Sequence, residues 1–282
     1  MIQELKEVAL DRRDEIRLSH TSGSVSPYKG FELPKIFTKP LIYDPNGEIQ
    51  AFSSGGRGAL LKYGKWFKLK GVRPERGKVY EDSGEPFGGM SRKKAIRELE
   101  ANDLVNKGFK KYGYKGPLIP VGNIEYDIPF NGENICCSIF RTLGDTRIFN
   151  ILRNKYQRAL KERDKSLGEF FIKVSEWMGL TDRILIEQNV ATNRYMGGLG
   201  NFTFYRLRDG YGIGPVDLSS SELDAGKAKR SNIFFMLDII KVENFIGFLS
   251  LHNLMEEKYL DVFEGNIIPK PIEEKWITRF VG

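Results

Sequence analysis

The helix predicted over residues 91–109 carries an acidic residue inside its apolar face, and this feature restricts the fold more than any other. At 100° per residue the apolar side chains form one arc, made of Ala95, Ile96, Leu99, Val105 and Phe109. Glu98 falls within that arc. Because a buried carboxylate is costly unless it is paired, Glu98 needs a cation. Lys70, at the end of the preceding strand, is the predicted partner.

The chain around this helix alternates between strand and loop patterns. Residues 2–18 have apolar residues at helical spacing, and residues 19–35 are rich in Ser, Gly and Pro, so we predict a helix followed by a linker. Residues 36–71 read as short antiparallel strands that end in KWFKLKG. Two further strands are predicted at 117–128 and 134–140. Ser91 is the predicted N-cap of the helix at 91–109, which precedes these two strands.

After residue 141 the pattern becomes mostly helical. The predicted elements are helices at 146–163, 166–179 and 182–190, a hairpin at 198–217, and more helices between 222 and 262. This order predicts an α+β fold with two lobes, a small antiparallel β lobe with one main helix and a larger helical lobe. The predicted parts are 1–35 (helix and linker), 36–142 (N-lobe) and 143–282 (C-lobe).

Glycines precede the strand that leads to Lys70. Gly55, Gly56 and Gly58 would let the backbone approach a phosphate closely, with N–H groups pointing at it, although a plain turn explains them too. Lys70 would act as a point charge against nucleotide phosphates, and an exposed edge strand is the alternative explanation of its charge.

The predicted hairpin near residue 210 has an oxygen-bearing side chain at each end. Asn201 precedes its first strand and Asp217 follows its second, 16 residues later (217 − 201 = 16). Such oxygens suit a hard cation, so we predict that they bind Mg²⁺, which would bridge ATP phosphates. A helix cap or a turn is the alternative role for a single Asp at a strand end.

Two segments resemble a known family. FKLKGVRPE and GGMSRKKAIRELEAND are similar to the corresponding segments of selenoprotein-O-type pseudokinases, with Leu69-Lys70-Gly71 at the strand end and Ile96-Arg97-Glu98 in the helix. The resemblance covers roughly residues 48–220. It implies a protein-kinase-like fold and transfer of AMP from an inverted ATP to protein hydroxyls. It also implies phosphate binding by two arginines after the hinge, here Arg141 and Arg147, one residue closer together than the family pattern.

One departure concerns the catalytic base. Protein kinases have an Asp five residues before the metal-binding Asn, where this chain has Met196, and the resembling family has an Asp directly before it, where this chain has Gly200. Phosphoryl and nucleotidyl transfer depend mainly on positioning and charge stabilisation, so activity does not require that base. A non-catalytic nucleotide-binding scaffold is the alternative.

A second alternative is an ATP-dependent nucleic-acid ligase. Residues 68–73, KLKGVR, resemble the K-x-D-G-x-R motif, in which the first lysine, here Lys68, would be the adenylylated nucleophile. Lys70 stands where that family has Asp. The net charge of +7, from 44 basic and 37 acidic residues, suits a polyanion partner and equally a solvated basic surface.

The sequence therefore predicts an ATP- and Mg²⁺-dependent transferase that moves a phosphoryl or AMP group to a hydroxyl of a protein or a small molecule. Lys70 would hold phosphates, Glu98 would orient Lys70, and Arg141 and Arg147 would neutralise charge. The adjacent Cys136 and Cys137 are predicted to be buried thiols, which fits a reducing, cytoplasmic setting. No apolar run is long enough to span a membrane.

Overall fold

The computed structural model describes residues 14–54, 57–81, 84–147, 165–191, 202–224 and 249–280. These residues divide into two compact units. The first comprises residues 14–103 and 118–142, and the second comprises the remainder. Residues 104–117, which the sequence prediction assigned to the N-lobe, belong to the second unit. We describe each unit by itself.

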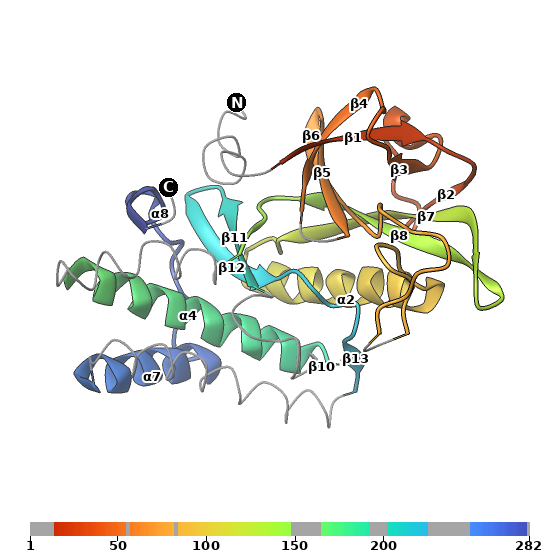
Figure 1. Ribbon diagram of the computed structural model, residues 1–282. Helices are drawn as coiled ribbons and strands as arrows, with labels where there is room; N and C mark the ends of the chain where they lie inside the picture. Colours follow the sequence, from red (N-terminus) through yellow and green to blue (C-terminus); the bar gives the residue numbers. More distant parts are fainter. Residues whose placement is uncertain are drawn as a thin grey trace. The chain divides into compact units, whose positions relative to one another are not determined.

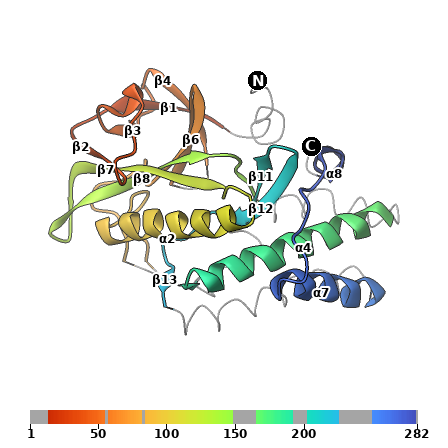
Figure 2. The ribbon, with the colours of Figure 1, turned by 180° about the vertical axis from the view of Figure 1, so that it is seen from behind.

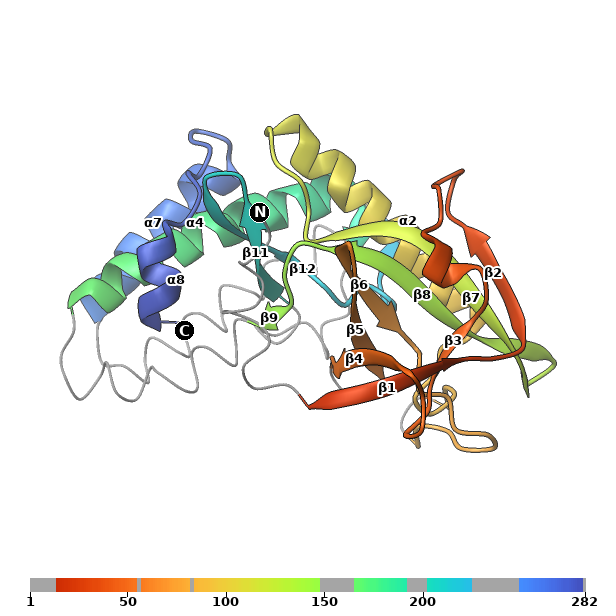
Figure 3. The same ribbon diagram turned by 90° about the horizontal axis from the view of Figure 1, so that it is seen from above.

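An antiparallel sheet of eight strands forms the first unit, in the order β2-β7-β8-β6-β5-β4-β1-β3 (Figures 1 and 3). The strands are β1 Glu15–His20, β2 Gly23–Pro27, β3 Leu41–Tyr43, β4 Ile49–Ser53, β5 Gly58–Tyr63, β6 Lys65–Lys70, β7 Leu118–Phe130 and β8 Glu133–Thr142. Five of them, β4 to β8, follow the predicted strand positions within a few residues. Neighbouring strands along the chain are joined mainly by short turns, as expected for antiparallel pairing.

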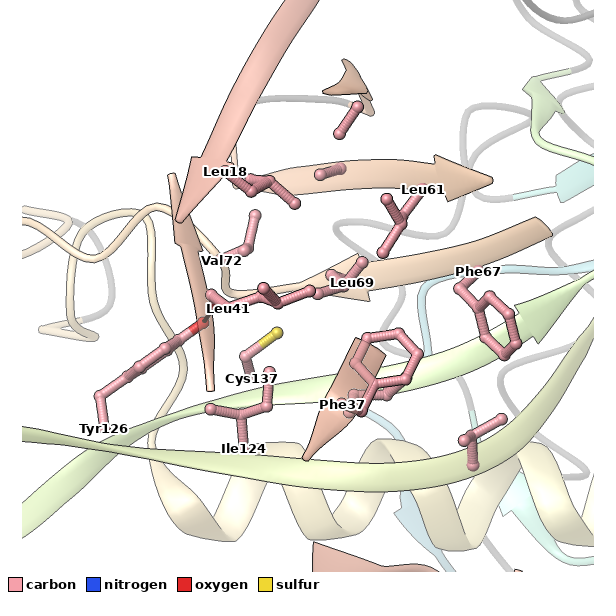
Figure 4. Packing of buried hydrophobic residues seen from close by; sticks show 14 of the residues in the cluster. Leu18, Phe37, Leu41, Leu61, Phe67, Leu69, Val72, Ile124, Tyr126 and Cys137 are labelled. Atoms are coloured by element: carbon pink, nitrogen blue, oxygen red, sulfur yellow. Dashed lines mark hydrogen bonds between the residues drawn. The ribbon is translucent and has the colours of Figure 1, made fainter. Parts of the chain in front are cut away.

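The sheet curls around one hydrophobic cluster. Side chains from β1, β3, β6, β7 and β8 point toward one another there, together with Phe37 of the short 3₁₀ helix η1 (Lys35–Phe37) (Figure 4). Tyr126 on β7 is fully buried and donates its hydroxyl hydrogen to the carbonyl oxygen of Leu41 on β3, at 2.7 Å. We call this side of the sheet the core face, marked on β6 by Phe67 and Leu69.

Strands β6 and β8 are buried on both faces. The opposite face carries Lys68 and Lys70 on β6, and Cys136, Ser138 and Phe140 on β8, all of them buried. We call it the helix face, because the helix α2 (Arg92–Lys111) lies alongside it (Figure 2). Burial on both sides explains the near-continuous apolar run of β8 and keeps both cysteines as buried, free thiols, as predicted.

The N-terminal prediction is wrong where the structure describes it. Residues 15–18 belong to β1 rather than to a helix, and β2 lies inside the predicted linker. The physical reason is the period: Ile16 and Leu18 are buried while Glu15 and Arg17 are exposed, which is an alternation of two residues. Pairing with β4 and β3 fixes this register. Residues 2–13 of the predicted helix lie outside the described residues.

The helix α2 forms close to the predicted position. The Ser91 hydroxyl oxygen accepts a hydrogen bond from the backbone N–H of Lys94 at 3.5 Å, in keeping with the predicted N-cap. Glu98, Leu99, Val105 and Phe109 are buried as predicted. Ile96 is the exception, with 40% of its surface exposed, because it lies on the flank of the buried face.

Besides residues 104–111 of α2, the described residues of the second unit form three helices and five short strands. They are α4 Lys165–Glu187, α7 Leu249–Phe263, α8 Glu274–Phe280, β9 Thr146–Arg147, β10 Val190–Ala191, β11 Phe202–Leu207, β12 Gly210–Pro215 and β13 Glu222–Leu223. The predicted hairpin is present as β11 and β12, paired antiparallel from Phe202↔Pro215 to Leu207↔Gly210. The helix predicted at 146–163 and most of the helical region after residue 224 lie outside the described residues.

The predicted break near residue 180 is absent, because α4 is continuous through Gly179. A Cβ at Gly179 would lie 2.5 Å from the Tyr259 carbonyl oxygen, so this glycine lets α7 approach α4 closely (Figure 3). The Thr181 hydroxyl lies 2.9 Å from the carbonyl oxygens of both Trp177 and Ile213.

Both units together give a mixed fold with an antiparallel sheet and separate helices, so the α+β class is confirmed at that level.

A buried carboxyl group between α4 and α7 makes stability depend on pH. Burial raises the pKa of Asp182 to about 8, although the Tyr259 hydroxyl donates a hydrogen bond to it at 2.9 Å. Between about pH 4 and pH 8 the folded chain therefore holds a proton that the unfolded chain has lost. The free energy of unfolding should fall across this window as pH rises, by up to about 1.4 kcal/mol per pH unit.

Asp182→Asn should remove this slope, because the amide keeps an oxygen acceptor for Tyr259 and does not titrate. Urea unfolding at several pH values measures it, with Glu257→Gln on the exposed side of α7 as the matched control. An unchanged slope in Asp182→Asn would contradict the assignment.

Candidate functional site

The ion pair predicted from the sequence is present in the first unit. The Lys70 Nζ lies 2.5 Å from the Glu98 Oε1, and the two residues are 5% and 0% exposed. Lys70 ends β6, and Glu98 lies in the second turn of α2. A charge-assisted hydrogen bond of this length, held away from water, fixes both side chains in one geometry. The pair therefore links the central strand of the sheet to the helix that crosses it.

Contacts around the pair set the position of α2 on the helix face. Ser138, the cross-strand partner of Lys70 on β8, donates its hydroxyl hydrogen to the carbonyl oxygen of Ala95 at 3.1 Å. Met90, two residues before the helix begins, exchanges two backbone hydrogen bonds with Cys136, at 3.1 and 2.8 Å. Together these contacts place Glu98 directly over the end of β6.

The first turn of α2 carries three basic residues, Arg92, Lys93 and Lys94, and no acidic one. Positive charge at a helix N-terminus opposes the helix dipole. Glu85, from the loop between β6 and α2, supplies the missing negative charge: its carboxylate lies 3.4 Å from the Ser91 backbone nitrogen and 3.3 Å from the Lys94 Nζ. Sequence analysis did not identify this residue, because it belongs to a loop rather than to the helix.

The glycine-rich turn leads directly to Lys70. Gly58 is the cross-strand partner of Lys70 in the β5–β6 pair, and the backbone N–H of Gly71 donates to the Arg57 carbonyl oxygen at 2.9 Å. A Cβ at Gly58 would lie 2.3 Å from the Ser54 carbonyl oxygen, so the tight turn itself requires glycine. Gly55 and Gly56 lie outside the described residues.

The structure separates Arg141 from Lys70. Arg141 pairs with Phe67 in the β6–β8 register, and paired residues share a face, so the strand directs Arg141 to the core side while Lys70 lies on the helix face. The expectation that Arg141 neutralises phosphate charge beside Lys70 is therefore not supported by the register. Arg147 lies in β9, opposite Thr203 of β11, and belongs to the second unit.

The predicted metal ligands belong to the second unit. Asp217 follows β12 and is partly buried, and its Oδ1 accepts a hydrogen bond from the Ser219 hydroxyl at 3.1 Å. Asn201 lies directly before β11, outside the described residues. Within the parts of the chain that the structure describes, His, Cys, Asp and Glu side chains form no group of three that could hold a metal ion. Mg²⁺ binding by Asn201 and Asp217 stays a prediction.

A second buried lysine, Lys68, shares the helix face with Lys70. It is 2% exposed and lies two residues earlier on β6. The sequence analysis considered it only as a ligase nucleophile, and its alternation with Lys70 along the strand was the signal that they share a face.

No protein-family model matches the chain, and no curated protein matches it. Among solved structures, that of WaaP in complex with acyl carrier protein is similar over 76% of this chain and 77% of that chain, with a TM-score of 0.47 and 11% sequence identity. A similarity of this extent does not establish a shared fold. Among the described residues no helix is long and apolar enough to cross a membrane.

Breaking the ion pair from one side should destabilise the protein strongly. Lys70→Met leaves the Glu98 carboxylate buried without its ammonium partner, which should cost about 3–5 kcal/mol in the free energy of unfolding. The double variant Lys70→Met with Glu98→Leu should recover most of that loss. Urea unfolding measures both, and Lys65→Met, at the exposed start of the same strand, is the matched control. A Lys70→Met variant as stable as Lys65→Met would contradict the buried pairing.

Glu85→Gln should weaken the start of α2. Removing the negative charge near three basic residues should cost about 1 kcal/mol in the free energy of unfolding at low ionic strength, and less in high salt. Glu81→Gln, an exposed change in the same loop, serves as the control and should have no measurable effect. Equal stability of the two variants at low salt would show that Glu85 does not stabilise the helix.

Proposed function

We propose that this chain is a kinase-like transferase that uses ATP and Mg²⁺ to move a phosphoryl or AMP group to a hydroxyl acceptor. The observation that supports the proposal most directly is the buried pair of Lys70 and Glu98. A lysine oriented by a helical glutamate is the arrangement that positions nucleotide phosphates in kinases. The segments around these two residues are also the ones that resemble selenoprotein-O-type pseudokinases.

The geometry of the first unit suits the phosphate part of a nucleotide. Lys70 is held by Glu98, and its cross-strand neighbour Gly58 presents backbone without a side chain. Glu98 would keep the ammonium in one orientation, so that little reorganisation is needed when an anion binds. Nothing in this arrangement selects between phosphoryl and adenylyl transfer.

The second unit would contribute the metal ligands. Asp217 offers a carboxylate, and Asn201 an amide oxygen, and oxygen donors of this kind suit Mg²⁺. When bound, Mg²⁺ would neutralise phosphate charge. The Ser219 hydroxyl donates to the Asp217 Oδ1 and so orients the carboxylate. Arg147 remains a candidate for phosphate binding, whereas the strand register gives no support to Arg141.

Turnover of ATP should depend on Asp217 and should not depend on Asp209, which lies in the turn of the hairpin. Asp217→Ala should lower Mg²⁺-dependent turnover of ATP about 100-fold or more, a loss typical of removing a group that stabilises charge in a reaction. Asp209→Ala changes an exposed carboxylate in the turn between β11 and β12 and should leave turnover unchanged. Equal turnover in the wild type and Asp217→Ala would rule out this role.

The transferred group can be read out in the same assay. ATP labelled separately at the α- and γ-phosphates, incubated with the protein and candidate hydroxyl acceptors, distinguishes AMP transfer from phosphoryl transfer. Nucleotide binding without transfer of either label would instead support the scaffold alternative.

A further inference from the structure

Arg73 lies in the loop between β6 and α2, and hydrogen bonds hold its backbone in place. The backbone N–H of Arg73 donates to the Gly88 carbonyl oxygen at 3.1 Å. The preceding residue, Val72, accepts a hydrogen bond at 2.9 Å from the backbone N–H of Tyr43, which ends β3. A Cβ at Gly88 would lie 1.8 Å from the Arg73 carbonyl oxygen, so this close approach requires glycine. The loop and the end of β3 therefore place Arg73 and Tyr43 beside each other.

The side chains of Arg73 and Tyr43 stack at the surface of the first unit. The central carbon of the Arg73 guanidinium lies 4.9 Å from the centroid of the Tyr43 ring. Tyr43 is exposed and Arg73 is partly buried. The Nε and Nη2 atoms of Arg73 are nevertheless closed off from water, and neither has a hydrogen-bond partner among the described residues. A buried donor without an acceptor destabilises a fold, so a native structure normally supplies an acceptor for each.

The two unpartnered donors form one edge of the guanidinium. Nη2 is the terminal nitrogen on the same side as the Nε–H, so an N–H bond of each points in nearly the same direction. This is the edge with which an arginine binds two oxygens of one carboxylate or phosphate group. A single oxyanion would therefore satisfy both donors of Arg73 at once.

The carboxylates nearest in the chain to Arg73 and to Tyr43 have other partners. Glu75 contacts the Lys78 ammonium, and Asp44 accepts hydrogen bonds from a serine hydroxyl and from a backbone N–H. Among the described residues, no carboxylate forms an ion pair with Arg73. The part of the chain that the structure describes thus supplies no counter-ion for this guanidinium.

We propose that the Nε–Nη2 edge of Arg73 is a binding site for a small phosphate-type oxyanion, with the Tyr43 ring supporting the guanidinium from one face. Two oxygens of the anion accept the two N–H bonds, and its charge neutralises that of the arginine. Because this edge is covered, neighbouring side chains must shift for the anion to enter, so a small anion suits the site better than a nucleotide. The inference does not depend on the proposed transfer of a phosphoryl or AMP group.

Calorimetric titration of the full chain with inorganic phosphate, at constant ionic strength, tests the proposal. Arg73→Met should bind phosphate at least about tenfold more weakly than the wild type, because it loses the charge and both donors. Arg73→Lys keeps the charge without the parallel donors, so it should also bind more weakly than the wild type. The matched control is Arg76→Met, an exposed change in the same loop, which should bind like the wild type. Equal affinity in Arg73→Met and the wild type would overturn the proposal.

A second readout is specific to Arg73 and uses the wild-type protein, so it does not depend on the stability of a variant. In protein labelled with ¹⁵N-arginine, phosphate should shift the Nε–H resonance of Arg73, which is identified by its absence in Arg73→Lys. Phosphate bound beside Lys70 would leave this resonance in place. An Arg73 resonance that does not move at the highest phosphate concentration would overturn the proposal and would favour an internal water as the acceptor.

Sodium acetate separates the two sources of a paired-oxygen ligand. Acetate carries one charge and phosphate up to two, so phosphate should shift the Arg73 resonance at lower concentration. A response to acetate at lower concentration than to phosphate would show that the site takes a carboxylate, and would overturn the choice of a phosphate-type anion.

Discussion

The ion pair between Lys70 and Glu98 is the interaction on which the arrangement of the first unit depends. An ammonium and a carboxylate are removed from water together, and each compensates the desolvation of the other. A pair of well-packed apolar residues would serve stability as well or better. The ion pair between Lys70 and Glu98 instead fixes the position of the end of β6 relative to α2. The hydrogen bond from Ser138 to Ala95 and the bridge between Met90 and Cys136 hold the same relation from the neighbouring strand.

Much of this unit could be predicted from the sequence because its constraints are local. The strands from β4 to β6 follow each other through short turns, and the apolar face of α2 identified Glu98 as a buried carboxylate. Burial and the need for a counter-ion were then sufficient to predict Lys70 as its partner. Predicting the pair of Lys70 and Glu98 required only the helix pattern and the lysine at the end of the preceding strand.

Other features could not be predicted, and the reasons are physical. Ile16 fitted a helical spacing in sequence, but its burial is set by the pairing of β1 with β4, in which Glu15 lies opposite Phe52, 37 residues away (52 − 15 = 37). A break between residues 179 and 182 was predicted, whereas α4 is continuous there and Gly179 allows close contact between α4 and α7. The face of Arg141 depends on strand register, which a motif does not contain. Glu85 acts on the start of α2 from a loop, where no helix pattern could identify it.

The proposed function rests on residues of both units. The first unit provides Lys70, held by Glu98, on which the proposed phosphate binding rests. The second provides Asp217 after a short hairpin, a place from which a carboxylate could bind a cation. The interaction that organises the first unit is therefore also the one on which the proposed function rests.

Calorimetric titration with ATP and Mg²⁺ of the wild type, Glu98→Gln, Lys70→Met and the double variant tests this account most directly. If Glu98 acts by orienting Lys70, Glu98→Gln should weaken ATP binding in the wild-type background and should have no further effect once Lys70 is Met, which is a strong non-additivity. Fully additive losses, or ATP affinity that is the same in all four proteins, would contradict the claim that the pair forms a nucleotide site.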